Sequence, residues 1–374
     1  MRRKLLPHLF VLISLSLNAQ ETQEISLLFI GDVMQHQSQI NHAYNPETKK
    51  YEYDACFSEV APIIAQSDVT IANLEGTLAG PPYKGYPQFS APDELAMALH
   101  KSGIDILVTA NNHSCDRRKK GVEQTINTLD NLGIPHAGTY VNSQTRKLNY
   151  PYFITEKGFK LALLNYTYGT NGLPVDAPNV VNLIDRNTIL ADIKKAKLQS
   201  PDKIIAFLHW GEQYTSTPNK SQTDLADFLV ANGADIIIGS HPHVLQPMEN
   251  YYDETLKKDI VKIFSLGNFI SNQRDRYRDG GAMARIVLSK DEHGVHINNA
   301  GFYLTWVKTE YVGKRKQWTI LPAAQYEHDK SSLSVESSQK MKTFLSDSRS
   351  LMDAKNLNVY EYKYSPESSQ WKMR

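Results

Sequence analysis

Short apolar runs alternate with helix-like stretches along the first two thirds of the chain. Continuous runs rich in Val, Ile and Leu are typical of β-strands that are covered on both faces. Five such runs occupy residues 25–32, 68–76, 104–113, 203–211 and 234–243. Stretches with helical spacing, each closed by a glycine, lie between them at residues 93–103, 121–133 and 221–233. The repeated order of strand, loop and helix predicts an α/β fold with a largely parallel sheet at its centre.

The pattern changes in the last third of the chain. Residues 261–270, 281–289 and 294–307 have the pattern of strands without intervening helices, which predicts a second, antiparallel sheet. Beyond about residue 330 the chain becomes rich in Ser and Lys, and one further helix is expected at residues 337–354. We therefore expect a main domain at residues 25–310 and a C-terminal extension with a helix at residues 311–374.

The first twenty residues differ from the rest. Arg2, Arg3 and Lys4 precede a short apolar run, and small or polar residues follow near Ala19. This order is typical of a secretory signal peptide at residues 1–20, which is too short and too interrupted for a stable membrane span. The alternative is an uncleaved N-terminal anchor. A cleaved signal peptide predicts a periplasmic or secreted protein.

Composition narrows the classes of partner. The 374 residues carry a formal net charge of +1, so no overall field attracts nucleic acid or an anionic membrane. A preference for an anionic substrate must therefore come from positive charge at the binding site itself. Cys56 and Cys115 are the only cysteines of the sequence, and we expect them to be free thiols. Two cysteines also exclude a structural zinc site built from four thiolates.

Polar side chains gather where the predicted strands end. The residues are Asp32, Glu75, Asn112 with His113, His209, and His241 with His243. Each one alone is more often a turn, cap or half-buried polar residue, but the carboxyl ends of α/β strands are where ligands bind. Imidazole, carboxylate and amide donors suit Mn, Fe or Zn. A bridging carboxylate between further donors would hold two cations that clamp a phosphate and activate a water molecule.

At these positions the sequence resembles a known family. The segments GDVMQH, NLEG, ANNHSCD, HWGEQY, GSHPHVLQPME and FSLGNF occur in this order in CapA-like proteins, named for capsule and poly-γ-glutamate synthesis. That family is similar to the calcineurin-like metallophosphoesterases. The resemblance covers residues 25 to 310 and implies a four-layer α/β fold, in which a two-sheet β sandwich is flanked by helices, with a small C-terminal helical extension.

The resemblance also implies roles for single residues. Asp32 and His243 would bind one ion, and Glu75 would bridge to the second. The second ion would be bound by Asn112, His209 and His241. His113 would be the general acid that protonates the leaving group, with Asp116 orienting its ring.

Several departures from the family pattern leave the number of ions open. Metallophosphoesterases usually have a histidine two residues after the first aspartate, where this chain has Met34. His36 could complete that site instead. The bridging acid is usually an aspartate rather than Glu75, and the acid after HWG stands at Glu212, one residue earlier than expected. One or two divalent ions are therefore compatible with the sequence.

These observations predict an exported metal-dependent hydrolase of the phosphoesterase type that acts in the synthesis of a cell-envelope or capsule polymer. Its substrate would be a phosphoester or an anionic polymer. One alternative is a non-catalytic protein that binds polymer or serves as a structural part of an envelope synthesis or export complex. Another is a peptidase-like hydrolase of γ-linked chains. Residues 81–87 form either an aromatic lip over the site or a surface loop.

Overall fold

The computed structural model describes residues 23–329 and 331–373. The predicted signal peptide at residues 1–20 lies outside these residues. None of the helices in the described ranges combines the length and the apolar composition that crossing a membrane requires.

Most strands belong to two sheets. In the larger sheet the order is β20(Gln370–Met373), β19(Tyr360–Ser365), β17(Gly294–Val312), β16(Gly280–Asp291), β1(Gln23–Val33), β4(Val69–Leu74), β5(Ile106–Val108), β6(His136–Ala137), with β15(Asn268–Ile270) beside β1 and β18(Arg315–Pro322) beside β17. In the smaller sheet the order is β13(Leu245–Asp253), β14(Lys258–Leu266), β12(Ile236–Ser240), β11(Lys203–His209), β9(Phe159–Thr167), β8(Tyr152–Glu156). Two short pairs join β2(Tyr44–Asn45) to β3(Lys50–Tyr51) and β7(Thr139–Tyr140) to β10(Val180–Val181).

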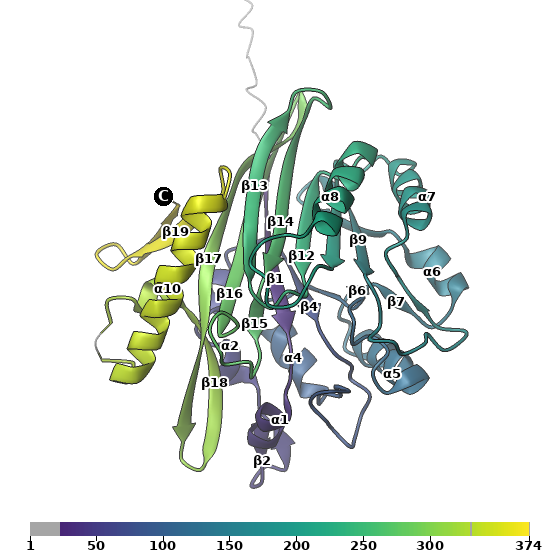
Figure 1. The fold of residues 1–374 in the computed structure, drawn as a ribbon. Coiled ribbons are helices and arrows are strands. Elements are labelled where there is room, and N and C mark those ends of the chain that lie inside the picture. The colour runs from purple at the N-terminus through teal and green to yellow at the C-terminus, as the bar shows by residue number, and fades with distance from the viewer. Residues whose placement is uncertain (1–22, 330, 374) are drawn as a thin grey trace, which may run out of the picture.

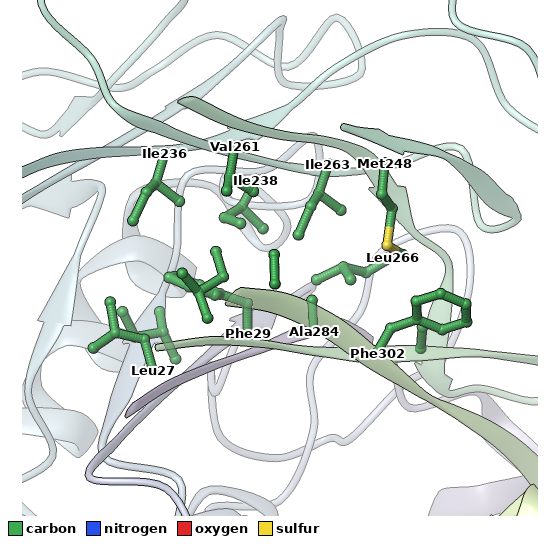
Figure 2. Close-up of a cluster of buried hydrophobic side chains, with 14 of the residues drawn as sticks. Leu27, Phe29, Ile236, Ile238, Met248, Val261, Ile263, Leu266, Ala284 and Phe302 are labelled. Atoms are coloured by element: carbon green, nitrogen blue, oxygen red, sulfur yellow. The ribbon is translucent and has the colours of Figure 1, made fainter. Parts of the chain in front are cut away.

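The two sheets pack face to face. Side chains from both meet in one buried apolar layer, as Figure 2 shows for Leu27 and Phe29 opposite Ile238 and Ile263. These positions alternate along their strands, because successive side chains of a strand point to opposite faces. The side chains between them point to the outer faces of the sheets, which helices cover. Both faces of these strands are therefore apolar, which explains the continuous apolar runs in the sequence.

Helices cover the outer faces. The helices are α1(Gln37–Ala43), α2(Asp54–Phe57), α3(Ala61–Ile64), α4(Glu94–Lys101), α5(Arg118–Asn131), α6(Ser143–Asn149), α7(Arg186–Lys197), α8(Lys220–Asn232), α9(Ala323–Tyr326) and α10(Val335–Lys355). Helices α2 to α4 share a core with the outer face of the larger sheet, and α7 and α8 share one with the smaller sheet. The predicted sandwich of two sheets flanked by helices is confirmed (Figure 1).

The expected division between a parallel sheet and a separate antiparallel sheet is wrong. Each sheet has its own parallel centre, formed by β1, β4, β5 and β6 in one and by β9, β11, β12 and β14 in the other. Strand β14 ends at Leu266, and the chain turns at Gly267 with φ +67° to enter the larger sheet as β15. Strands β16 and β17 then extend that sheet antiparallel to β1. The late strands thus divide between the sheets because the chain crosses from one to the other at this glycine.

The C-terminal segment is continuous with the larger sheet. The expected boundary at residue 310 falls inside β17, which pairs with β18 and, in parallel, with β19. Helix α10, near the expected position, places Met341 and Phe344 in the core between the sheets. Figure 1 shows α10 lying along β13 and β17. Residues 311–329 and 331–373 therefore complete the sandwich rather than follow it.

Candidate metal centre

The carboxyl ends of parallel strands from both sheets meet at one place. Asp32 lies at the end of β1, and Glu75 directly follows β4. From the smaller sheet, His209 is the last residue of β11 and His241 directly follows β12. Each side chain is at most 3% exposed. The site therefore lies where the two sheets converge, and it is built equally from each.

Two groups of donor atoms share Glu75. One group contains Asp32, Glu75 and His243, and the other contains Glu75, His209 and His241; within each group the ligand atoms lie within 4.8 Å of one another. Oε1 of Glu75 is 3.7 Å from Nε2 of His209 and 3.8 Å from Nε2 of His243. A carboxylate between two clusters of donors has the position of a bridging ligand.

Asn112 reaches the second donor group. Its Oδ1 lies 3.0 Å from Nε2 of His209, which in turn is 3.1 Å from Nδ1 of His241. On the first side, Nδ1 of His243 lies 3.0 Å from Oδ2 of Asp32. The structure thus brings together all six residues that sequence analysis expected to ligate metal, and its two donor groups match those that the family resemblance implies.

The electrostatics of the centre fit a divalent cation. Among the described residues, neither oxygen of buried Glu75 has a hydrogen-bond partner. Burial, and next the charge of Asp32, raises the pKa of Glu75 well above its usual value. Burial lowers the pKa of His209 well below its usual value and that of His241 to about 3, so both imidazoles are neutral, the form that ligates metal. A buried carboxylate without a partner among neutral imidazoles is the arrangement that a bound cation stabilises.

The loop after β12 turns two histidines into the centre. His241 and His243 have φ values of +98° and +59°, a conformation that non-glycine residues rarely adopt. Pro242 lies between them, and its carbonyl accepts the backbone N–H of Tyr214 at 2.8 Å. Strained backbone persists only where the surrounding structure fixes it, and such positions gather at functional sites. This conformation places one imidazole in each donor group.

His113 and Asp116 form a buried pair next to the donors. Nδ1 of His113 lies 2.8 Å from Oδ2 of Asp116, which also accepts the backbone N–H of Phe89 at 2.6 Å. The ring of Phe89 packs edge-on against the imidazole, with centroids 4.6 Å apart. The other ring nitrogen, Nε2, is 3.4 Å from Nδ2 of Asn171. Asp116 and Phe89 thus hold the ring of His113 in place.

The loop at residues 81–87 contributes to the rim of this pair. Tyr86 is exposed and packs against Phe89, with ring centroids 6.3 Å apart. The aromatic residue that covers His113 is therefore Phe89, two residues beyond the segment singled out in the sequence. The segment itself supports this contact from the solvent side.

Sequence reasoning missed two asparagines. Nδ2 of Asn73 donates to Oδ1 of Asp32 at 2.8 Å and lies 3.4 Å from Nδ1 of His209. Asn73 stands two residues before Glu75, so strand periodicity could have placed both on one side of the chain. Asn171 follows β9 and contacts His113 and Asn112. The strand-end rule would have found it, had residues 159–167 been included among the strand runs.

The departures from the family pattern have clear positions. Met34 is buried, and its backbone N–H donates to the backbone carbonyl of Ile270. Its side chain is a thioether and offers no imidazole nitrogen. His36 is in neither donor group; its Nδ1 accepts the N–H of Asn272, and burial lowers its pKa to about 4. Glu212 is exposed and outside both groups. The first donor group therefore has one donor fewer than the usual metallophosphoesterase pattern.

Sequence comparisons place this chain in a family. Residues 26–273 match the family model described as "Bacterial capsule synthesis protein PGA_cap". The capsule biosynthesis protein CapA of Bacillus anthracis is 30% identical over 267 residues, which are 68% of this chain and 61% of the relative. The PGA biosynthesis protein CapA of Bacillus subtilis (strain 168) is 30% identical over 284 residues, 72% of this chain and 69% of the relative. The match thus spans about three fifths of the length of the first relative.

Among solved structures, the NAD nucleotidase of Haemophilus influenzae has a TM-score of 0.49 at 12% identity, covering 93% of this chain and 66% of that chain. A calcineurin-like phosphoesterase of Bacillus subtilis has a TM-score of 0.45 at 14% identity, covering 88% and 97%. The family assignment rests on the sequence matches alone. They confirm the resemblance expected from the motifs, and the chain belongs to the CapA family of bacterial capsule synthesis proteins.

Proposed function

We propose that this chain is a divalent-metal-dependent hydrolase of the phosphoesterase type. The observation that carries the proposal is the bridging position of Glu75 between two buried donor groups, with His113 and its aspartate beside them. Asp32 and His243 would hold one ion, and His209, His241 and Asn112 the other. Bound there, the ions would polarise a phosphoryl oxygen and supply a water nucleophile at neutral pH.

The chain's own residues account for the rest of the chemistry. His113 would donate a proton from Nε2 to the departing oxygen, because Nδ1 is engaged by Asp116. Asn171, 3.4 Å from that nitrogen, is placed to orient the group that receives the proton. Asp116 keeps the ring aligned and stabilises the charged form of the imidazole before transfer.

The relatives supply the biological setting of the proposal. Their printed names refer to capsule biosynthesis and PGA biosynthesis. We infer that the substrate is a phosphoester or an anionic unit of an envelope polymer such as poly-γ-glutamate. Phosphoester chemistry is the first choice, because neutral imidazoles and carboxylates around a bridging acid are typical donors of sites that bind phosphate through metal ions.

Export belongs to the same proposal. The basic start and short apolar run of residues 1–20 would direct the chain to the periplasm or the outside. A fusion of residues 1–25 to a periplasmic reporter should cross the membrane, and the purified protein should begin within a few residues of Gln20. An intact N-terminus on the purified protein would favour the anchored form instead.

A screen of activity against metal content tests the catalytic proposal. The purified protein is analysed for bound Mn, Fe and Zn and then assayed on phosphomonoesters, phosphodiesters and γ-glutamyl oligomers. Turnover on a phosphoester that disappears with chelator and returns with metal supports the proposal. Turnover on γ-glutamyl oligomers alone would identify a peptidase-like hydrolase.

Buried Met34, which stands where metallophosphoesterases usually have a histidine donor, favours a second candidate. In that candidate the centre binds metal and polymer without turnover, within an envelope synthesis or export complex. Metal-loaded protein that binds γ-glutamyl polymer but hydrolyses none of the three substrate classes would establish it.

A further inference from the structure

The loop between β15 and β16 carries three arginines, and two of them attach the loop to the rest of the fold. Arg274 and Arg276 each stack on an aromatic ring and form hydrogen bonds outside the loop. The partners are Trp306 and Val307 for Arg274, and Phe344, Asp279 and Asp347 for Arg276. Among the described residues, the guanidinium of Arg278 forms an ion pair only with Asp275 of the same loop. Arg278 is therefore the arginine of this loop that a ligand can engage.

Arg278 lies beside the first donor group. Its Cζ is 4.4 Å from the centroid of the Tyr214 ring. That centroid is 6.0 Å from the centroid of the imidazole of His243, which belongs to the donor group with Asp32. The guanidinium is therefore no farther from this imidazole than the two distances taken together. A substrate whose reacting group is held at the donor groups can span such a separation.

Main-chain bonds fix both members of this stack to the segments that carry the donors. The carbonyl of Arg278 accepts a hydrogen bond from Nδ2 of Asn268 at 2.9 Å, and Asn268 is paired with Asp32 between β15 and β1. The backbone N–H of Tyr214 donates to the carbonyl of Pro242, in the loop that carries two histidine donors. The placement of the arginine is therefore tied to the geometry of the centre.

The stack is open to solvent, whereas the donors are buried. Tyr214 is 50% exposed, and the side chain of Arg278 is 23% exposed. The side chain of Asp275 is 79% exposed, and an ion pair with so exposed a partner contributes little, so that an anion of a ligand can replace it. A guanidinium presents a planar set of N–H donors that matches a carboxylate or a phosphate, and the ring of Tyr214 supports that plane.

We propose that Arg278 binds a second anionic group of the substrate, a carboxylate or a phosphate that is several bonds away from the phosphoryl group at the metal centre. This inference rests on the proposed function, because it places the reacting phosphoryl group at the two donor groups. It narrows the substrate to phosphoesters that carry a further negative charge. The formal net charge of +1 gives no general attraction for anions, and this arginine supplies a local one.

Binding of phosphonates, which the protein cannot hydrolyse as esters, tests the inference without relying on turnover. The full-length, metal-loaded protein is titrated calorimetrically with propylphosphonate and butylphosphonate. It is then titrated with 3-phosphonopropionate and 4-phosphonobutyrate, in which a carboxylate replaces the terminal methyl group. Each carboxylate compound should bind about tenfold more tightly than its alkyl counterpart. Propane-1,3-bisphosphonate is the phosphate-like probe; tighter binding of it than of 4-phosphonobutyrate would identify the second group as a phosphate, and the reverse order as a carboxylate.

Two substitutions should change this preference in opposite directions. Arg278→Gln should remove it, so that the two members of each pair bind equally. Asp275→Asn should strengthen the binding of the compounds with a second anionic group by about two- to threefold, because the competing carboxylate is gone. Arg315→Gln is the matched control, since it removes an arginine that pairs with Glu52 at 2.9 Å outside the donor groups. The control should keep the full preference.

Measurements of stability and metal content separate loss of binding from loss of fold. Thermal unfolding and bound metal should be the same in all three variants as in the unsubstituted protein, because none of the changed side chains is a donor or is buried. A preference retained in Arg278→Gln, or equal binding of each pair by the unsubstituted protein, overturns the inference and leaves the phosphoesterase function in place. Failure of every phosphonate to bind the metal-loaded protein would overturn the phosphoesterase function, and the inference with it.

Discussion

Nδ1 of His113 lies 2.8 Å from Oδ2 of Asp116, and both side chains are at least 95% buried. The pair stands next to the donor groups without belonging to either. Asn112 precedes His113 in the chain and contacts His209 of the second donor group. Under the proposed function these adjacent residues would have separable roles: Asn112 would ligate metal, and His113 would donate the proton.

His113→Ala should keep its metal and its fold but lose turnover. Removal of a general acid costs about 10²–10⁴-fold in rate, and the loss should be smallest for esters whose leaving group needs no proton. Asn112→Ala should lose metal as well as activity. Metal analysis and steady-state kinetics on both variants give the comparison.

A second His–Asp pair, away from the donor groups, offers the matched control for this experiment. Nε2 of His136 lies 3.1 Å from Oδ1 of Asp130, outside the centre. His136→Ala should leave kcat and metal content unchanged. Full turnover in His113→Ala would contradict the assignment of this residue as the acid.

Glu75→Gln should lower metal content and stabilise the metal-free protein. Glu75 has a raised pKa when folded, so at neutral pH its ionisation destabilises the folded state relative to the unfolded one. The gain should be about 1.4 kcal/mol for each pH unit between the unfolded pKa and the folded pKa, or between the unfolded pKa and the assay pH where the folded pKa lies above it. Denaturant titration with and without chelator measures it. A metal-free variant less stable than the unsubstituted protein would count against a cation site.

The two histidines of the loop after β12 should have separable effects on metal stoichiometry. His243→Asn removes a donor from the group with Asp32, and His241→Asn removes one from the group with His209. Asparagine tolerates the positive φ of both positions. Each variant should bind less metal, and the double variant should bind none. His293→Asn, at an exposed position, is the control. Unchanged metal content in the double variant would contradict the assignment of this metal site.

The stability of the metal-free protein should depend on pH in two opposing ways. His209 and His241 have lowered pKa values, so their contribution is complete above about 6.5 and is lost as pH falls towards about 3 for His241. Glu75 has a raised pKa, so its contribution is complete below about 4.5 and is lost as pH rises through its folded value. Glu75→Gln should therefore steepen the loss of stability between pH 6.5 and pH 5. Equal slopes in the variant and the unsubstituted protein would contradict this account.

Phe344→Ala in α10 should destabilise the whole sandwich. Its ring is 1% exposed and packs in the core between the sheets. Truncation of a buried phenylalanine costs about 3–5 kcal/mol. A single cooperative transition at lower denaturant would show that the C-terminal segment folds with the sheets. A separate transition for residues beyond 310 would show an independent extension.

The strand-end residues could be predicted because they depend on local pattern. Asp32, Glu75, His209 and His241 each follow an apolar run, and such runs in parallel strands end at one edge. Sheet membership could not be predicted in this way, because apolar runs buried on both faces look alike in either sheet. The pairing of β1 with β16 joins residues more than 250 positions apart, and nothing local in either strand specifies that partner.

His36 shows the corresponding limit for the site. Its spacing from Asp32 fits a metal ligand. In the structure, however, its Nδ1 accepts a hydrogen bond from the backbone N–H of Asn272, which is distant in the sequence.

The donor groups are assembled from distant parts of the chain: Asp32 and His243 stand 211 residues apart. In the proposed metal centre these donors come together only when the two sheets dock, so an ion would be bound at the end of folding rather than at its start. The cation bound there would then be the one available in the compartment where folding ends. A chain that crosses a membrane unfolded would take its metal at the destination, whereas one that crosses folded would carry a cytoplasmic metal with it.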